Sequence, residues 1–170
     1  SGTAQWTSRY DYASDQDAAA IIRNGPGSTV VVIGASENSP GDWDFAAVQY
    51  NASTGAQVNT NRNSASGSGF DQVYSADVDA SGNIYISGST SSGAAIASGG
   101  WQNTKGGSDD EFLAKFDRDG VRLWATYMGG EAGDYSRAVG VDANNNVYLV
   151  GYTESTTGIA YNGFDEIWSG

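Results

Sequence analysis

The hydrophobic pattern of the chain consists of short apolar and aromatic runs separated by clusters of Gly, Asn, Asp and Ser. The clearest stretch, residues 110–152, holds the runs EFLAKF, RLWATYM, SRAVGV and NVYLVGY. Runs rich in aromatic and β-branched residues and bounded by turn residues predict β-strands. The runs VVVI, IYIS and VYLV do not alternate between polar and apolar residues, which is typical of strands buried on both faces. The sequence therefore predicts an all-β protein.

The strand pattern repeats along the chain. One strand of each repeat ends on a glycine, and these glycines lie 54 and 63 residues apart; they are Gly34, Gly88 and Gly151. An aspartate upstream recurs at intervals of 56 and 63 residues, at Asp15, Asp71 and Asp134. Periods of roughly 40–60 residues with four strands each predict β-propeller blades. A glycine after a buried strand lets neighbouring backbones approach closely.

We interpret residues 1–170 as a single β-propeller segment of about three four-stranded antiparallel blades. The units run approximately over 11–60, 61–128 and 129–170, and the last unit is completed by a strand at 4–10. This N-terminal strand is offset so that it could close a ring and protect sheet edges. Closed propellers have about 4–8 blades. We therefore expect the chain to belong to a larger propeller, or to close with copies of itself through strand exchange.

The predicted strands occupy corresponding places in the three units. The first strands are expected at 18–22, 75–78 and 137–141, and the second strands at 30–33, 84–87 and 147–150. The third strands are expected at 44–50, 110–116 and 165–168. The fourth strands are expected at 56–60, 121–127 and 4–10.

Charge and composition exclude several function classes. The formal net charge is −12 with only 8 basic residues, so a nucleic-acid backbone or an anionic membrane surface would be repelled. The chain has no Cys and no His, which excludes disulfide frameworks, thiol catalysis and His-based triads within it. No apolar run approaches the ~18 residues of a membrane span, so we expect no membrane insertion.

Two acidic turns raise the question of calcium, and no other cofactor is expected. Asp77 and Asp79 begin a stretch like an EF-hand loop, but its twelfth position, which needs Glu, is Gly88. Asp117 and Asp119 form a similar turn without the later ligand. Hairpin-turn chemistry explains both stretches better, while calcium binding at these four aspartates stays open.

Clustered carboxylates could also serve glycoside hydrolysis, which needs two acids roughly 5–10 Å apart. The candidates are Asp109, Asp110, Glu111, Asp165 and Glu166. Because Asp44, Asp110 and Asp165 recur once per unit, a hydrogen bond between blades explains them more simply than an active site. We therefore expect no catalytic residues. A carboxylate pair in a deep pocket without counterparts in other units would favour a carbohydrate-active enzyme instead.

The segments between second and third strands are rich in Gly, Ser and Thr and vary in length. Their aromatic residues are Trp43, Trp101, Tyr161 and Phe164. A loop anchored by one buried aromatic is the simpler interpretation. Otherwise these residues would line a rim that binds a sugar or a protein.

Three motifs link the repeats to a known family. They are D-x-F-x-A-K-x-D-x-x-G, W-x-T-Y-x-G-G and V-D-x-x-G-N-x-Y-x-x-G. The matching residues are Asp110, Phe112, Ala114, Lys115, Asp117 and Gly120; Trp124, Thr126, Tyr127, Gly129 and Gly130; Val78, Asp79, Gly82, Asn83, Tyr85 and Gly88; and Val141, Asp142, Asn146, Tyr148 and Gly151. The first copy departs from the third motif, since Val31 stands where Tyr85 and Tyr148 stand.

With these motifs the chain resembles the bacterial seven-bladed β-propeller repeats of large secreted and cell-surface proteins. The resemblance implies a β-propeller in an extracellular or surface setting, with a structural, adhesive or ligand-binding role toward a protein or glycan. It implies no catalytic residues. A calcium-stabilised surface or filament protein is a further alternative.

Overall fold

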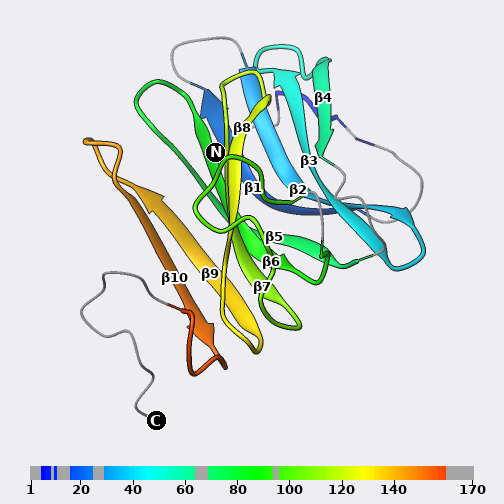
Figure 1. Cartoon of the computed structure of the whole chain (residues 1–170). Helices are drawn as coiled ribbons and strands as arrows, with labels where there is room; N and C mark the ends of the chain where they lie inside the picture. The colour runs from blue at the N-terminus through cyan, green and yellow to red at the C-terminus, as the bar shows by residue number, and fades with distance from the viewer. Residues whose placement is uncertain are drawn as a thin grey trace.

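The computed structural model describes residues 5–8, 10, 16–24, 29–63, 69–93 and 96–159. All regular structure in these residues is β (Figure 1). The first sheet contains β1 (Gln16–Asn24), β2 (Thr29–Ser39), β3 (Asp42–Asn51) and β4 (Gln57–Asn63). The second contains β5 (Asp71–Val78), β6 (Ile84–Thr90), β7 (Asp110–Phe116) and β8 (Arg122–Met128). The third contains β9 (Asp134–Val141) and β10 (Val147–Thr153).

Every neighbouring pair of strands is antiparallel, and each sheet follows chain order. The prediction of antiparallel four-stranded units is confirmed for the first and second sheets, and all ten described strands lie where the sequence predicts them. The third sheet has two strands among the described residues. Its expected third strand at 165–168 lies outside them, as do Asp15, Tyr161 and Phe164. The described part of the chain contains no helix of the length and hydrophobicity that crossing a bilayer would require.

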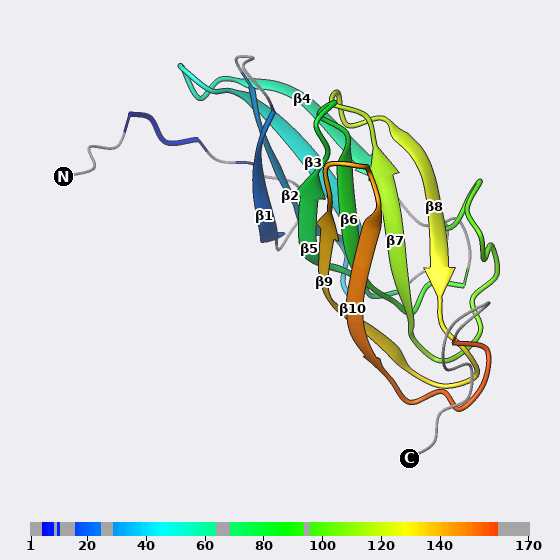
Figure 2. The ribbon, with the colours of Figure 1, turned by 90° about the vertical axis from the view of Figure 1, so that its left-hand side faces the viewer.

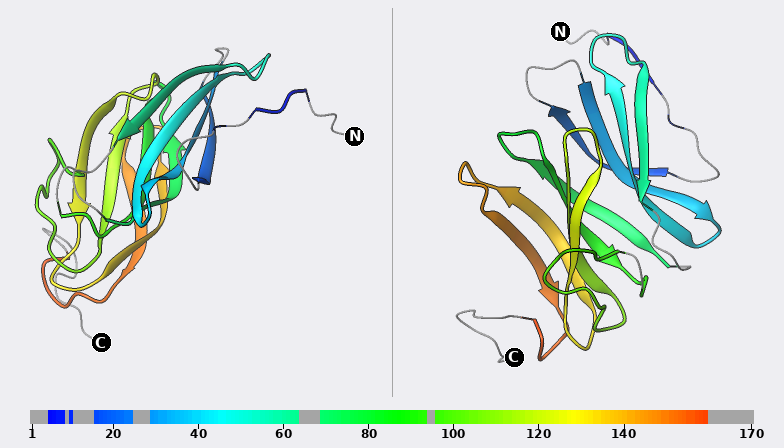
Figure 3. Two further views of the ribbon diagram at one scale, coloured as in Figure 1. Left: turned by 90° about the vertical axis from the view of Figure 1, so that its right-hand side faces the viewer. Right: turned by 45° about the horizontal axis from the view of Figure 1, so that its top comes forward.

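The N-terminal segment differs from the prediction. Residues 5–8 and 10, described within the expected strand 4–10, are not in a strand. The Trp6 indole Nε1 donates to the Ala52 carbonyl at 2.9 Å, and its ring stacks on Tyr50 with centroids 6.3 Å apart. Gly55, at φ +70°, makes room for this ring, because a Cβ there would come within 2.5 Å of it. The described residues of this segment therefore pack on the first unit rather than on the third sheet, and the described strands do not close into a ring (Figures 2 and 3).

The recurring glycines lie opposite β-bulges. Gly88 pairs with Val73 while Ser87 pairs with Ser75, so Tyr74 is the extra residue of the bulge. The same shift occurs opposite Gly34 and Gly151. A Cβ on Gly88 would lie 1.9 Å from the Gln72 carbonyl oxygen, and one on Gly151 would lie 2.4 Å from the Tyr135 carbonyl oxygen. The predicted close approach of backbones is confirmed at both positions, and it follows from the tightened bulge geometry.

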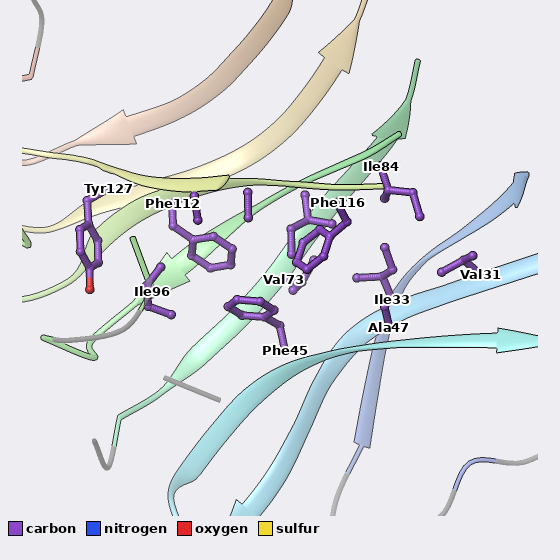
Figure 4. Packing of buried hydrophobic residues seen from close by; sticks show 13 residues of the cluster. Val31, Ile33, Phe45, Ala47, Val73, Ile84, Ile96, Phe112, Phe116 and Tyr127 are labelled. Carbon is purple, nitrogen blue, oxygen red and sulfur yellow. The ribbon is translucent and has the colours of Figure 1, made fainter. Parts of the chain in front are cut away.

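The second sheet lies between the other two and is covered on both faces (Figures 1 and 2). Every residue of β6 is buried. Alternate residues of β7 divide between two apolar clusters: Phe112, Ala114 and Phe116 join the cluster shared with the first sheet, and Leu113 joins the one shared with the third. Between the first two sheets, Phe45 stacks on Phe112 with ring centroids 5.4 Å apart (Figure 4).

Candidate functional site

The repeated aspartates hold each unit together from within. The Thr90 hydroxyl donates to the Asp71 carboxylate, and the Ser92 hydroxyl does so at 3.1 Å. Asp134 has the same arrangement, because Thr153 and Ser155 donate to it and the Gly130 amide adds a bond of 2.8 Å. These bonds tie the start of a first strand to the end of the second strand of the same unit. These bonds run within a unit, whereas the sequence favours a hydrogen bond between blades for aspartates that recur once per unit. Burial raises the pKa of Asp71.

Asp110 is likewise engaged in local structure. Its carboxylate accepts the amides of Gly106 and Gly107 at 2.8 and 2.9 Å. It therefore shapes the end of the long loop that leads into β7.

Three of the four aspartates proposed for calcium, namely Asp77, Asp79 and Asp117, accept hydrogen bonds from backbone amides. Asp79 accepts the Ser81 and Asn83 amides at 2.9 Å each. Asp117 accepts the amides of Asp119 and Val121 at 2.9 and 2.8 Å. The Asp77 carboxylate accepts the Val78 and Val141 amides at 2.8 and 2.7 Å. Within the described ranges, no group of three or more acidic side chains could hold a metal ion. These residues therefore form no ligand set for calcium, and calcium binding stays a prediction.

The two described aromatic candidates lie on different units. Trp43 is half-buried on β3, where its ring is 6.0 Å from that of Phe70 and its amide donates to the Gly69 carbonyl. Trp101 is 57% exposed on the loop that follows β6, and the neighbouring Gln102 bridges to β8. The buried-anchor interpretation suits Trp43 better than Trp101. The structure does not bring the pair together into one rim.

A pocket of about 210 Å³ lies between the second and third sheets, beside Glu111 on β7. Its lining residues are Glu111, Met128, Gly129, Asp134, Gly151, Tyr152, Thr153 and Ile159. The Glu111 Oε1 atom is buried and has no hydrogen-bond partner. Burial raises the pKa of Glu111 to about 7; the nearby Ser136 side chain opposes this increase, and the negative charge of Asp134 adds to it. This carboxyl group combines a strongly raised pKa with a place in the lining of a pocket, which is typical of a functional site.

Glu111 has no acidic counterpart in the first unit. The repeat glycine pairs with Ala46 in the first sheet and with Phe112 in the second, so Phe45 and Glu111 occupy equivalent places. In the sequence alone, Glu111 stands out only as a member of an acidic cluster. Its special position emerges when the strands are aligned on their glycines, because an acid then stands where the first unit has a buried phenylalanine.

A second unusual feature is the outer face of the third sheet, defined by Tyr148, Val150 and Tyr152. These side chains are 57%, 60% and 47% exposed. They stand three and one residues before, and one residue after, the repeat glycine. The corresponding residues of the second unit, Tyr85, Ser87 and Ser89, are 2%, 0% and 5% exposed, and those of the first unit are equally buried. The third sheet thus exposes to solvent the face that, in the first and second units, is covered by the following sheet.

Comparison with known proteins places a propeller repeat at this part of the chain. No curated protein matches the sequence. A family model described as the SBBP beta-propeller repeat matches residues 123–157. The matched stretch runs from the last strand of the second sheet through both described strands of the third. Residues 123–157 are therefore similar to a beta-propeller repeat, and the described fold around them is all-β and antiparallel.

Proposed function

We propose that this chain is a non-enzymatic propeller module with a structural or adhesive role, and that the outer face of its third sheet docks a further propeller unit. The exposure of Tyr148, Val150 and Tyr152 carries the proposal. Equivalent side chains are buried wherever a following sheet is present. A contiguous apolar face of this kind is typical of an interaction surface. Docking of a further unit on this face would remove it from water.

The remaining surface suits rigid display of loops. Stacked sheets fix the loops between second and third strands, and the exposed Trp101 offers an aromatic contact to a protein or glycan partner. An extracellular or cell-surface location belongs to the same proposal and rests on the family resemblance.

The carbohydrate-active alternative has one observation in its favour, the raised pKa of Glu111 in a pocket. A general acid needs such a pKa. However, Asp134, the other carboxylate among the described lining residues, accepts bonds from Thr153, Ser155 and Gly130 and repeats the arrangement of Asp71. A carboxylate fixed in this way is a poor second catalytic group, so we favour the binding module.

Light scattering on the purified 170-residue chain over a wide concentration range tests the docking face. A second copy is then the available occupant, and we expect association that rises with concentration. Replacing Tyr148, Val150 and Tyr152 together by Ser should give a monomer. Val58→Ser is the matched control, because Val58 is 57% exposed but lies on β4. A parent chain that stays monomeric at the highest concentration contradicts the proposal.

A further inference from the structure

We propose that the pocket beside Glu111 binds the cationic end of an alkylammonium or alkylguanidinium group, with Glu111 as its counter-ion. This site shares Tyr152 with the docking face of the third sheet but is centred on Glu111 of β7, and it does not depend on that proposal. The ligand is defined by its chemistry: a positive head on an apolar stem. A free amine and a lysine or arginine side chain both satisfy it.

One oxygen atom of the Glu111 carboxyl group is unsatisfied. Glu111 Oε1 is buried without a hydrogen-bond partner, and leaving such a group unpaired costs free energy. Its other oxygen, Oε2, lies toward Gly151, since a Cβ on that glycine would be 3.3 Å away from it. A positively charged donor entering the pocket would supply the missing charge-assisted hydrogen bond.

The described cationic side chains near the pocket are engaged elsewhere, so a ligand would have to supply the positive charge that pairs with Glu111. Lys115, four residues along β7 on the same face, instead contacts Asp79 at 3.7 Å and lies 4.8 Å from the Tyr85 ring centroid. Arg137 lies over the Tyr152 ring at 4.9 Å. Asp134, which lines the pocket, adds a second negative charge. The local field therefore favours a cation, as does the net charge of −12.

The rest of the pocket suits a short apolar stem. Met128 and Ile159 line it together with glycine backbone. Its volume of about 210 Å³ corresponds to several water molecules at ~30 Å³ each. This volume accommodates a butyl-sized stem. Methionine adapts its shape to such a group at little cost.

The test is an NMR titration of the ¹⁵N- and ¹³C-labelled chain with butylammonium chloride and, separately, with Nα-acetyl-lysine methylamide. Both probes should shift the resonances of Glu111, Met128 and Gly151, and binding should strengthen from pH 5.5 to pH 8 as Glu111 ionises. Binding of butylammonium alone would point to free amines as the ligand. Stronger binding of the lysine derivative would point to a protein side chain.

Glu111→Gln should weaken binding of both probes by about tenfold or more, which corresponds to losing one charged partner. Glu154→Gln, which removes the same charge from an exposed side chain, should leave the affinity within about twofold. The Nε-acetylated lysine derivative should not bind. Bound probe should also lower the Glu111 pKa, read from its carboxyl ¹³C shift in the parent chain.

Equal weakening by both variants would overturn the proposal, because it would indicate only diffuse attraction to an acidic protein. Binding of the neutral analogue would overturn it as well. Ile159→Ala provides an independent variant should Glu111→Gln fold poorly, and it should weaken butylammonium more than methylammonium. Failure of this site would leave the light-scattering result unchanged, so the two proposals are distinguishable.

Discussion

The two interfaces of the second sheet use the same backbone positions with opposite chemistry. Toward the first sheet, Phe45 and Val73 belong to one buried apolar cluster. Toward the third sheet, Glu111 and Ser136 take the equivalent positions next to and opposite the repeat glycine. The first interface is held by apolar packing. The second has a smaller apolar cluster and relies on hydrogen bonds between the sheets.

Those hydrogen bonds form a ladder of side chains across the second interface. The Ser136 hydroxyl donates to the Ser87 hydroxyl at 2.8 Å, and the Val139 amide donates to the Ser75 hydroxyl at 3.2 Å. The Val141 amide donates to Asp77 at 2.7 Å. The repeat thus determines which backbone positions of two sheets face each other. The side chains at those positions determine whether the interface is apolar or is polar enough to include a ligand site.

The largest effect is expected at the apolar interface. Phe45→Ala removes a ring that is 1% exposed and packs on both Phe112 and Phe116. We expect the free energy of unfolding to fall by about 3–5 kcal/mol, because the cavity cannot close between two sheets. Urea unfolding measures it. Phe70→Ala, at a ring that is 44% exposed, should cost less than about 1 kcal/mol; similar losses for both variants would break the comparison.

A smaller effect is expected from the polar interface. Asp77→Ala removes the acceptor of the Val141 amide, which then lies between two sheets without its partner. The free energy of unfolding should fall by about 1–3 kcal/mol. Asp119→Ala, at an exposed turn position, should change it by less than about 0.5 kcal/mol. Hydrogen exchange of the Val141 amide should accelerate in the first variant only, and unchanged protection would contradict the ladder.

The stability that the polar interface contributes should also depend on pH, whereas the contribution of Phe45 should not, because phenylalanine does not titrate. The pKa of Glu111 is raised from 4.5 to about 7, so the folded state retains a proton that the unfolded chain releases. This contribution to stability is fully present below pH ~4.5 and is lost as pH rises through about 7. Because Glu111 is partly solvated, we expect a loss on the order of 1–2 kcal/mol.

Urea unfolding of the parent chain and of Glu111→Gln between pH 5 and pH 8 measures this effect. The difference in stability between the two should change by that amount over the range, with Gln relatively more stable at high pH. Subtracting the variant removes the contributions of other titrating groups, such as Asp71. A constant difference would show that Glu111 titrates normally and that its burial has no energetic consequence.

The strands, their order and the repeat glycines could be predicted because they depend on local pattern. Runs such as IYIS at 84–87 and turns such as Asp79–Asn83 carry their structure in a few adjacent residues. The Asp142 turn repeats the Asp79 turn bond for bond, from the two amides to the tyrosine hydroxyl. A turn that is encoded in a few adjacent residues can be recognised from the sequence of any one unit.

The site depended on contacts between units, which local pattern does not encode. Glu111 resembles an ordinary solvent-facing acid until the sheet register places it opposite β9 and β10. Trp6 resembles Trp124, yet it packs on Tyr50 and bonds to Ala52 of the first unit instead of extending the last. Which packing forms depends on which surface has space for the indole ring and a carbonyl oxygen to accept its N–H. These features exist only in the folded chain.

The smallest expected effect concerns metal at the polar interface. A calcium ion bound between the sheets, at Asp77 beside one end of β9 or at Asp134 at the other, would offer another way to hold the second interface. Its removal would weaken that interface alone. However, Asp77 and Asp134 already accept several hydrogen bonds from the protein, so little coordinating capacity remains. We expect excess chelator to shift the melting temperature by less than about 1 °C, since a lost site worth ~1 kcal/mol would shift it by several degrees. A drop of that size in the parent chain, absent in Asp77→Ala, would assign the second interface to a bound ion rather than to its hydrogen bonds.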